Sequence, residues 1–138
     1  MSKTITGLLI ITFVLLLGCL GPQITAPPVE GKTCDGNINC IVEAFYNDCE
    51  KAYGTINFAD QNITGFIQVV SKENDQCKGY LKLVDGSVPD IVKGLDAECL
   101  ISKEEAEALE TELNLEELNC KGPLFEALKL QQSFTQNQ

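Results

Sequence analysis

The chain of 138 residues contains no histidine, no arginine and no tryptophan. Without histidine it lacks the base of Ser-His-Asp and Cys-His catalytic sites and the imidazole ligand of many metal sites. Without arginine it lacks the planar cation that binds phosphate or carboxylate through two parallel hydrogen bonds. These absences remove most enzyme candidates, so we expect a protein that is not an enzyme and that uses no cofactor and no metal.

Positive charge is also scarce. The sequence has 20 acidic residues against 10 lysines, which gives a net charge of −10. A charge of this sign opposes binding to nucleic acid and to anionic lipid headgroups, and it favours solubility, cations or a basic partner. We interpret most of the acidic side chains as a solvated surface and expect no nucleic-acid partner.

The amino-terminal segment has the parts of an export signal. Lys3 precedes an uncharged apolar stretch from Ile5 to Gly18. This stretch has about the length of a signal-peptide core and is shorter than the ~20 residues of a membrane-spanning helix. Residues 1–18 are therefore predicted to be a signal peptide.

The residues that end this stretch are Leu16-Leu17-Gly18-Cys19. They resemble the lipobox of prokaryotic lipoproteins, and the Cys-Leu-Gly that follows is similar to archaeal lipoproteins in particular. The resemblance implies that Cys19 becomes the lipid-bearing first residue of the mature protein, held at the outer face of the cell membrane. Two acyl chains are enough for stable anchoring, whereas one is marginal.

Two alternatives to the lipoprotein remain, an uncleaved helical anchor and a plain cleaved signal. A long helix is disfavoured by the glycine and prolines that follow the apolar stretch, Gly21, Pro22, Pro27 and Pro28. All three interpretations place the mature chain outside the cytoplasm.

Composition divides the mature chain into three parts. Residues 19–33 carry the lipidated cysteine and three prolines without periodicity, which predicts a flexible tether. Residues 34–130 are about the length of one small domain. Residues 131–138 are polar and aperiodic, and we expect a disordered tail.

Six cysteines remain once Cys19 is assigned to the lipid. An even number in a small domain outside the cytoplasm predicts three disulfides, each contributing about 2–4 kcal/mol. No Cys-x-x-Cys spacing supports a zinc or redox site. The predicted disulfide cysteines are Cys34, Cys40, Cys49, Cys77, Cys99 and Cys120.

Part of the disulfide connectivity follows from a predicted helix that starts near Asn37 and stops before Gly54. Its apolar positions recur at three- and four-residue steps, and Cys49 falls on that face. On such a helix, Cys40 lies about 13 Å from Cys49 along the axis, beyond the ~7 Å that a disulfide allows. We therefore expect Cys49 to pair with Cys77 or Cys99 rather than with Cys40.

Strand patterns follow this helix. Residues 63–70 and 77–84 predict an antiparallel hairpin across a polar turn, and shorter strands are expected at 55–58 and near 98–101. Ser102 to Glu105 forms a capping box before an amphipathic helix, and Gly122-Pro123 suits a last helical turn.

The predicted fold is therefore α+β: an N-terminal helix packed on a small antiparallel sheet of three to four strands, followed by C-terminal helices. A helix laid across a curved sheet is similar to the cystatin-like arrangement. That similarity concerns arrangement and transfers no function.

Three candidate sites have simpler interpretations. The nine carboxylates from Asp96 to Glu117 lack the loop spacing of a calcium site and suit a solvated surface. Asp85-Gly86-Ser87 is typical of a turn rather than of an aspartic protease. Asn62-Ile63-Thr64 matches the N-glycosylation pattern, so Asn62 is a candidate glycosylation site.

These observations favour a non-enzymatic lipoprotein that binds a protein or small molecule or maintains the envelope. A protease or hydrolase inhibitor is the first alternative, with Asp85–Gly94 as its candidate loop. A hydrolase that uses carboxylates alone is the second, and it would need two acids facing one pocket.

The lipid and cysteine assignments are tested by intact and peptide-level mass of the protein extracted from membranes. We expect a chain that begins at Cys19, carries the mass of acyl groups and has no free thiol. Three or more free thiols would overturn the disulfide framework and reopen the metal and redox interpretations.

Overall fold

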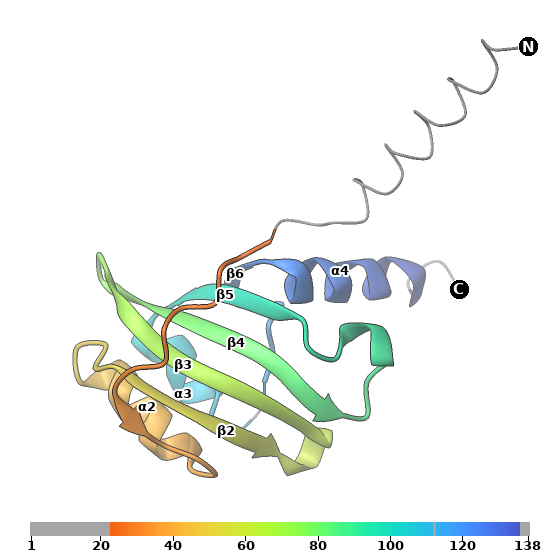
Figure 1. Cartoon of the computed structure of the whole chain (residues 1–138). Helices are drawn as coiled ribbons and strands as arrows, with labels where there is room; N and C mark the ends of the chain where they lie inside the picture. Colours follow the sequence, from red (N-terminus) through yellow and green to blue (C-terminus); the bar gives the residue numbers. More distant parts are fainter. Residues whose placement is uncertain (1–22, 112, 136–138) are drawn as a thin grey trace, which may run out of the picture.

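A mixed six-stranded sheet forms the centre of the domain, with strand order β1-β2-β3-β4-β5-β6 (Figure 1). The computed structural model describes residues 23–111 and 113–135, so the predicted signal peptide and Cys19 lie outside the described residues. The strands are β1 (Lys32–Thr33), β2 (Ala52–Phe58), β3 (Ile63–Glu73), β4 (Gln76–Gly86), β5 (Asp96–Ile101) and β6 (Asn119–Lys121).

Helices accompany this sheet, so the fold is α+β. The helices in the described residues are α2 (Ile38–Tyr46), α3 (Lys103–Ala108) and α4 (Pro123–Thr135), with short 3₁₀ turns η1 (Ala59–Gln61) and η2 (Asp90–Val92). The sheet is larger than the three to four strands predicted, because β1 and β6 are too short to leave a strand pattern in the sequence.

The β3–β4 hairpin is the longest pair in the sheet and confirms the predicted hairpin. Its register runs from Ile63↔Gly86 to Glu73↔Gln76, and the turn places Asn74 in the left-handed region at φ 55°. Apolar side chains alternate along both strands, so that Ile67 and Leu81 share one face. The hairpin thereby gives the sheet an apolar face and a more polar one.

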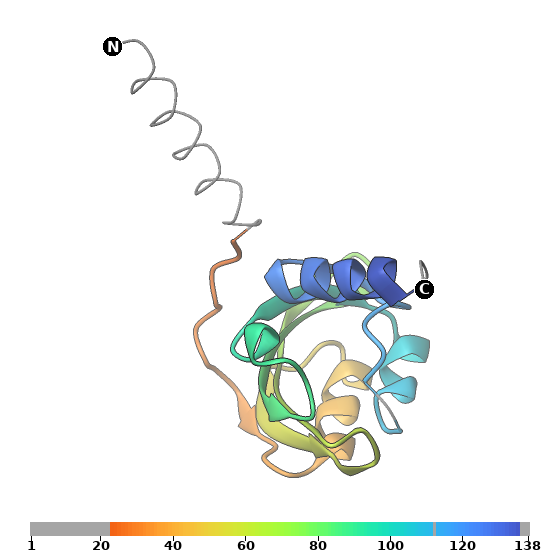
Figure 2. The same ribbon diagram turned by 90° about the vertical axis from the view of Figure 1, so that its right-hand side faces the viewer.

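The apolar face is the concave one. Figure 2 shows the sheet curving around α2 and α3, with α4 lying across one end. The most buried large side chains include Phe45 and Ile41 of α2, Leu124 of α4 and Val69 of β3. Each helix therefore contributes to one core against the concave face.

On the convex face lies an extended segment, residues 23–33, which we call the strap (Figure 1). The Nε2 of Gln68 on β3 donates to the Pro28 carbonyl at 2.6 Å, and Gln68 is buried. At its end the strap becomes β1, which pairs in parallel with β2. The sequence predicted a free tether up to residue 33, whereas residues 23–33 lie against the sheet.

Helix α2 begins where it was predicted, because the Asn37 side chain accepts from the backbone N–H of Cys40. It ends at Tyr46, earlier than expected, and Asp48 and Cys49 follow in the left-handed region at φ 58° and 61°. Cys49 therefore lies beyond the helix and not on its face, which corrects the predicted position.

Disulfides join Cys34 to Cys40, Cys49 to Cys77 and Cys99 to Cys120. Cys40 does not pair with Cys49, and Cys49 pairs with one of its two predicted partners. The third bridge joins residues that face each other directly on β5 and β6, with Cα atoms 4.0 Å apart.

The two C-terminal helices differ in length from the prediction. Ser102 and Glu105 form the predicted capping box, but α3 ends at Ala108, and the following residues form turns that bury Leu115 and Leu118. Helix α4 starts at Pro123 as expected and continues to Thr135, into the segment predicted to be a disordered tail.

Two strand glycines provide a test of this packing. A Cβ at Gly54 would lie 2.6–2.8 Å from backbone atoms of Cys34 and Asp35, whereas one at Gly65 would have a nearest neighbour at 3.4 Å, Leu81 Cδ1. We expect Gly54→Ala to lower the free energy of unfolding by about 1–3 kcal/mol or more, because backbone cannot move aside cheaply. Urea unfolding with intact disulfides measures this, and Gly65→Ala is the control. Equal losses in the two variants would contradict the close approach.

Candidate functional site

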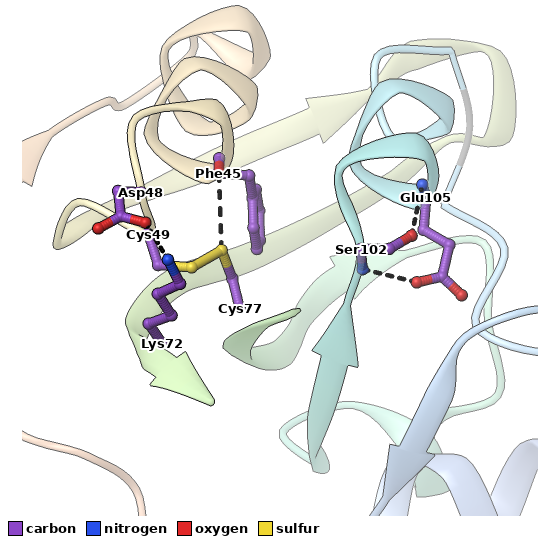
Figure 3. Close-up of a disulfide and its surroundings, with 7 residues drawn as sticks. All are labelled: Phe45, Asp48, Cys49, Lys72, Cys77, Ser102 and Glu105. Carbon is purple, nitrogen blue, oxygen red and sulfur yellow. Dashed lines mark hydrogen bonds and ion pairs between the residues drawn. A yellow bond between two sulfur atoms is a disulfide. The ribbon is translucent and has the colours of Figure 1, made fainter. Parts of the chain in front are cut away.

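A groove of about 440 Å³ lies where three connections meet: the turn after α2, the tip of the β3–β4 hairpin and the junction of β5 with α3. Figure 3 shows part of it, around the Cys49–Cys77 disulfide. Its apolar floor is lined by Phe45, Cys49, Cys77 and Ile101. Its polar rim contains Asp48, Lys72, Asp75, Gln76, Ser102, Lys103 and Glu104.

The floor is fixed by covalent and backbone constraints. The Cys49–Cys77 bridge ties the chain after α2 to the start of β4, with Cα atoms 5.4 Å apart. The Phe45 carbonyl also lies 3.6 Å from the Cys77 Sγ (Figure 3). Consecutive left-handed residues at Asp48 and Cys49 turn the chain sharply, which brings the sulfur over the core.

The rim carries both signs of charge. The Lys72 ammonium forms an ion pair with the Asp48 carboxylate at the rim, beside the Cys49–Cys77 disulfide (Figure 3). Through this hydrogen bond the pKa of the Asp48 carboxyl is lowered and that of the Lys72 ammonium is raised. Both groups are charged at neutral pH, and the rim carries them as an exposed ion pair.

Hydrogen bonds hold the start of α3 at the groove and connect α3 to α2. The Tyr46 hydroxyl at the end of α2 donates to the Glu107 carboxylate on α3. Ser102 Oγ accepts from the Glu105 N–H at 3.2 Å, and the Glu105 carboxylate accepts from the Ser102 N–H at 2.7 Å. The capping box fixes the start of α3 at the rim, and the tyrosine joins α3 to α2.

The candidate inhibitor loop, Asp85–Gly94, forms a second exposed feature. At its tip Ile91 is 82% exposed, whereas the adjacent Val92 is buried. Lys93 forms ion pairs with Asp85 at 3.4 Å and Asp90 at 3.1 Å, and Gly94 N–H donates to the Leu83 carbonyl at 2.7 Å. The loop thus holds one apolar side chain in solvent on a fixed base, with carboxylates beside it.

Asn62 of the predicted glycosylation pattern is exposed and follows η1 in the left-handed region at φ 50°. Its side-chain amide donates to the Ser87 hydroxyl, and its carbonyl accepts from the Ser87 N–H at 2.8 Å. Asn62 thus joins the β2–β3 connection to the loop after β4. Its glycosylation remains a prediction.

The predicted acidic run does not converge on one site. Glu98 lies on the convex face between Lys78 at 3.3 Å and Lys121 at 3.0 Å. Burial opposes its ionisation, but these two lysines outweigh burial and the pKa of Glu98 is lowered. Glu104 instead lies at the groove rim. Within the described ranges, no three acidic or cysteine side chains are grouped as a metal site would require.

No pattern in the sequence predicted the groove. Its lining comes from three distant segments that only the β-sheet register and the Cys49–Cys77 bridge bring together. The sequence contained one signal for the groove, the expected pairing of Cys49 with a strand cysteine. A Cys49–Cys77 bridge places the turn after α2 beside the β3–β4 turn.

Neither a protein-family model, nor a curated protein, nor a solved structure matches this chain. In the part of the chain that the structure describes, no helix has the length and apolar character needed to cross a membrane.

Two tyrosine hydroxyls donate to carboxylates, that of Tyr46 to Glu107 and that of Tyr80 to Asp96 at 2.8 Å. Hydrogen bonding to Glu107 raises the pKa of Tyr46 to about 12, and burial together with the Asp96 hydrogen bond raises the pKa of Tyr80 to about 12. Because the protonated forms are favoured in the folded state, this stabilisation is present below about pH 10 and is lost as the pH rises toward 12.

We expect Glu107→Gln to lower the Tyr46 pKa toward its ordinary value. Asp96→Asn should lower the Tyr80 pKa less, because burial is the larger cause there. Ultraviolet titration of tyrosinate in the two variants measures both changes. No shift in Glu107→Gln would show that α2 and α3 are not joined through this hydroxyl.

Proposed function

We propose that this protein is a membrane-anchored extracytoplasmic lipoprotein whose mature domain binds a ligand at the groove without chemical conversion. The observation that carries the binding role is the groove itself, which combines a disulfide-fixed apolar floor with an ion-paired rim. Its volume lies within the range of about 300–1,000 Å³ that is usual for small-molecule sites.

The anchor is supported by how the cysteines pair. Cys34, Cys40, Cys49, Cys77, Cys99 and Cys120 form three bridges with one another. Cys19 is then the seventh cysteine of the chain, and it ends the lipobox-like sequence. A lipid on Cys19 would give this cysteine a role and hold the domain at the outer face of the cell membrane.

The rim indicates the class of ligand. Lysine and carboxylate side chains line the same hollow, so a ligand with an ammonium and a carboxylate that displaces the Lys72–Asp48 ion pair would find a partner for each charge. Amino acids and short peptides have this pattern of charges.

The test is a series of free amino acids and dipeptides followed by NMR chemical shifts of the mature domain. We expect shifts to cluster at groove residues, and Lys72→Ala to weaken binding about tenfold, a change of about 1.4 kcal/mol. The matched control is Lys51→Ala, which removes an exposed ion pair with Glu30 on the strap. Chemical-shift changes at residues outside the groove alone, or an equal loss of affinity in the two variants, would contradict the proposal.

A second candidate function, inhibition of a protease or hydrolase, is favoured by Ile91, an exposed apolar side chain on a fixed turn. The predicted similarity to the cystatin-like arrangement concerns the fold alone and does not identify an inhibitory loop. Nanomolar inhibition of an envelope protease, lost in Ile91→Ala and kept in Lys72→Ala, would replace the groove proposal with this one.

The carboxylate-dependent hydrolase has less support. The groove does bring Asp48, Asp75 and Glu104 to one rim. However, a general acid needs a raised pKa, whereas the pKa of Asp48 is lowered by its hydrogen bond from Lys72. The geometry therefore favours binding over hydrolysis.

A further inference from the structure

The strap begins at the α4 end of the domain. A Cβ at Gly122, in the junction between β6 and α4, would lie 3.2 Å from Ile24 Cδ1, so the Ile24 side chain packs against this junction. Figures 1 and 2 both show the first described residues beside α4 and at the opposite end of the domain from α2. From there the chain crosses the convex face to β1.

Several contacts fix the strap along this path. Pro28 accepts a hydrogen bond from the buried Gln68 side chain. Glu30 forms an ion pair with Lys51, and Lys32 N–H donates to the Lys51 carbonyl at 2.9 Å. Because the strap is held at these points, residues 23–33 do not add to the reach of a tether.

The free length between Cys19 and the domain is therefore short. Ile24 is the fifth residue after Cys19, and a fully extended chain spans at most about 18 Å over five residue steps. A free tether that ended at Cys34 would span about 50 Å by the same measure. A lipid on Cys19 would thus hold the α4 end within about 18 Å of the headgroups, whereas a long tether would let the domain rotate.

Charge is distributed unevenly in a way that suits this orientation. Residues 34–117 contain 18 carboxylates and six lysines, whereas residues 118–138 contain one carboxylate and two lysines. The strap residues 23–33 contain one of each. Helix α4 and the strap are therefore the segments of this acidic protein that a lipid surface repels least.

The outer surface of α4 has an amphipathic character. Leu130 is 61% exposed, and Lys129 lies over the Phe125 ring at 4.2 Å. An exposed leucine beside a lysine suits the boundary between acyl chains and headgroups.

We propose that α4 and the start of the strap form the membrane-facing surface of the lipid-anchored protein, with the lipid bilayer as its partner. The proposal rests on the lipid anchor of the proposed function. Helix α2 then points away from the bilayer.

The absence of tryptophan permits a direct test. Leu130→Trp places one tryptophan on α4, and the control Asn39→Trp places one at an exposed position of α2. Each variant is expressed from the full-length sequence, so that the cell can process it at Cys19, and is reconstituted in vesicles of equimolar phosphatidylcholine and phosphatidylglycerol that contain headgroup-labelled quencher lipid. We expect Leu130→Trp to lose most of its emission and Asn39→Trp to keep most of its own.

The experiment distinguishes failure of the proposed orientation from failure of the lipid anchor. If neither variant stays with the vesicles on flotation, the lipid anchor itself is wrong. If both float but are quenched equally, or Asn39→Trp is quenched more, the anchor stands and the orientation is overturned. Inserting a flexible ten-residue Gly-Ser segment after Gly21 lengthens the free chain, and we expect it to reduce the difference between the two positions.

Discussion

The Cys49–Cys77 disulfide is the constraint on which the arrangement of the domain depends most. It closes a separation of 28 residues, and by chain entropy alone such a loop contributes about 3–4 kcal/mol. The bridge joins the end of α2 to the first residues of β4, across the concave face. It therefore fixes the helix on the sheet and, in the same step, forms the floor of the groove. The same disulfide therefore both stabilises the domain and shapes the candidate site.

The alternation of side chains along β3 and β4 determines which residues lie on each face of the sheet. The side chains of Ile67 and Leu81 face the helices, whereas those of Gln68 and Tyr80 face the strap side. Gln68 is buried although it is polar, because the strap covers it and accepts its amide hydrogen. The strap consequently covers part of the convex face and is part of the fold rather than a linker attached to it.

Local patterns predicted the central elements well. The Asn37 cap, the β3–β4 hairpin and the Ser102–Glu105 capping box each depend on neighbours in sequence, and each is present. Patterns failed where a distant partner decides the structure. Lys32–Thr33 has no strand signal and becomes β1 only because β2 lies beside it, and Asn119–Lys121 becomes β6 opposite β5, to which Cys120 is bridged. The groove could not be predicted from the sequence for the same reason, since three separate connections contribute its lining residues.

The two ends of the sheet limit how a partner can bind. β1 has two residues and β6 has three, so neither offers the long row of backbone groups that strand addition needs. Next to β1, the Thr55 N–H of β2 is already used by the Asp35 carboxylate at 2.8 Å. A ligand of the proposed kind would therefore be recognised through side chains rather than through a sheet edge. Among the described residues, the groove combines an apolar floor with fixed charges of both signs, and it forms where the turns around the Cys49–Cys77 bridge meet.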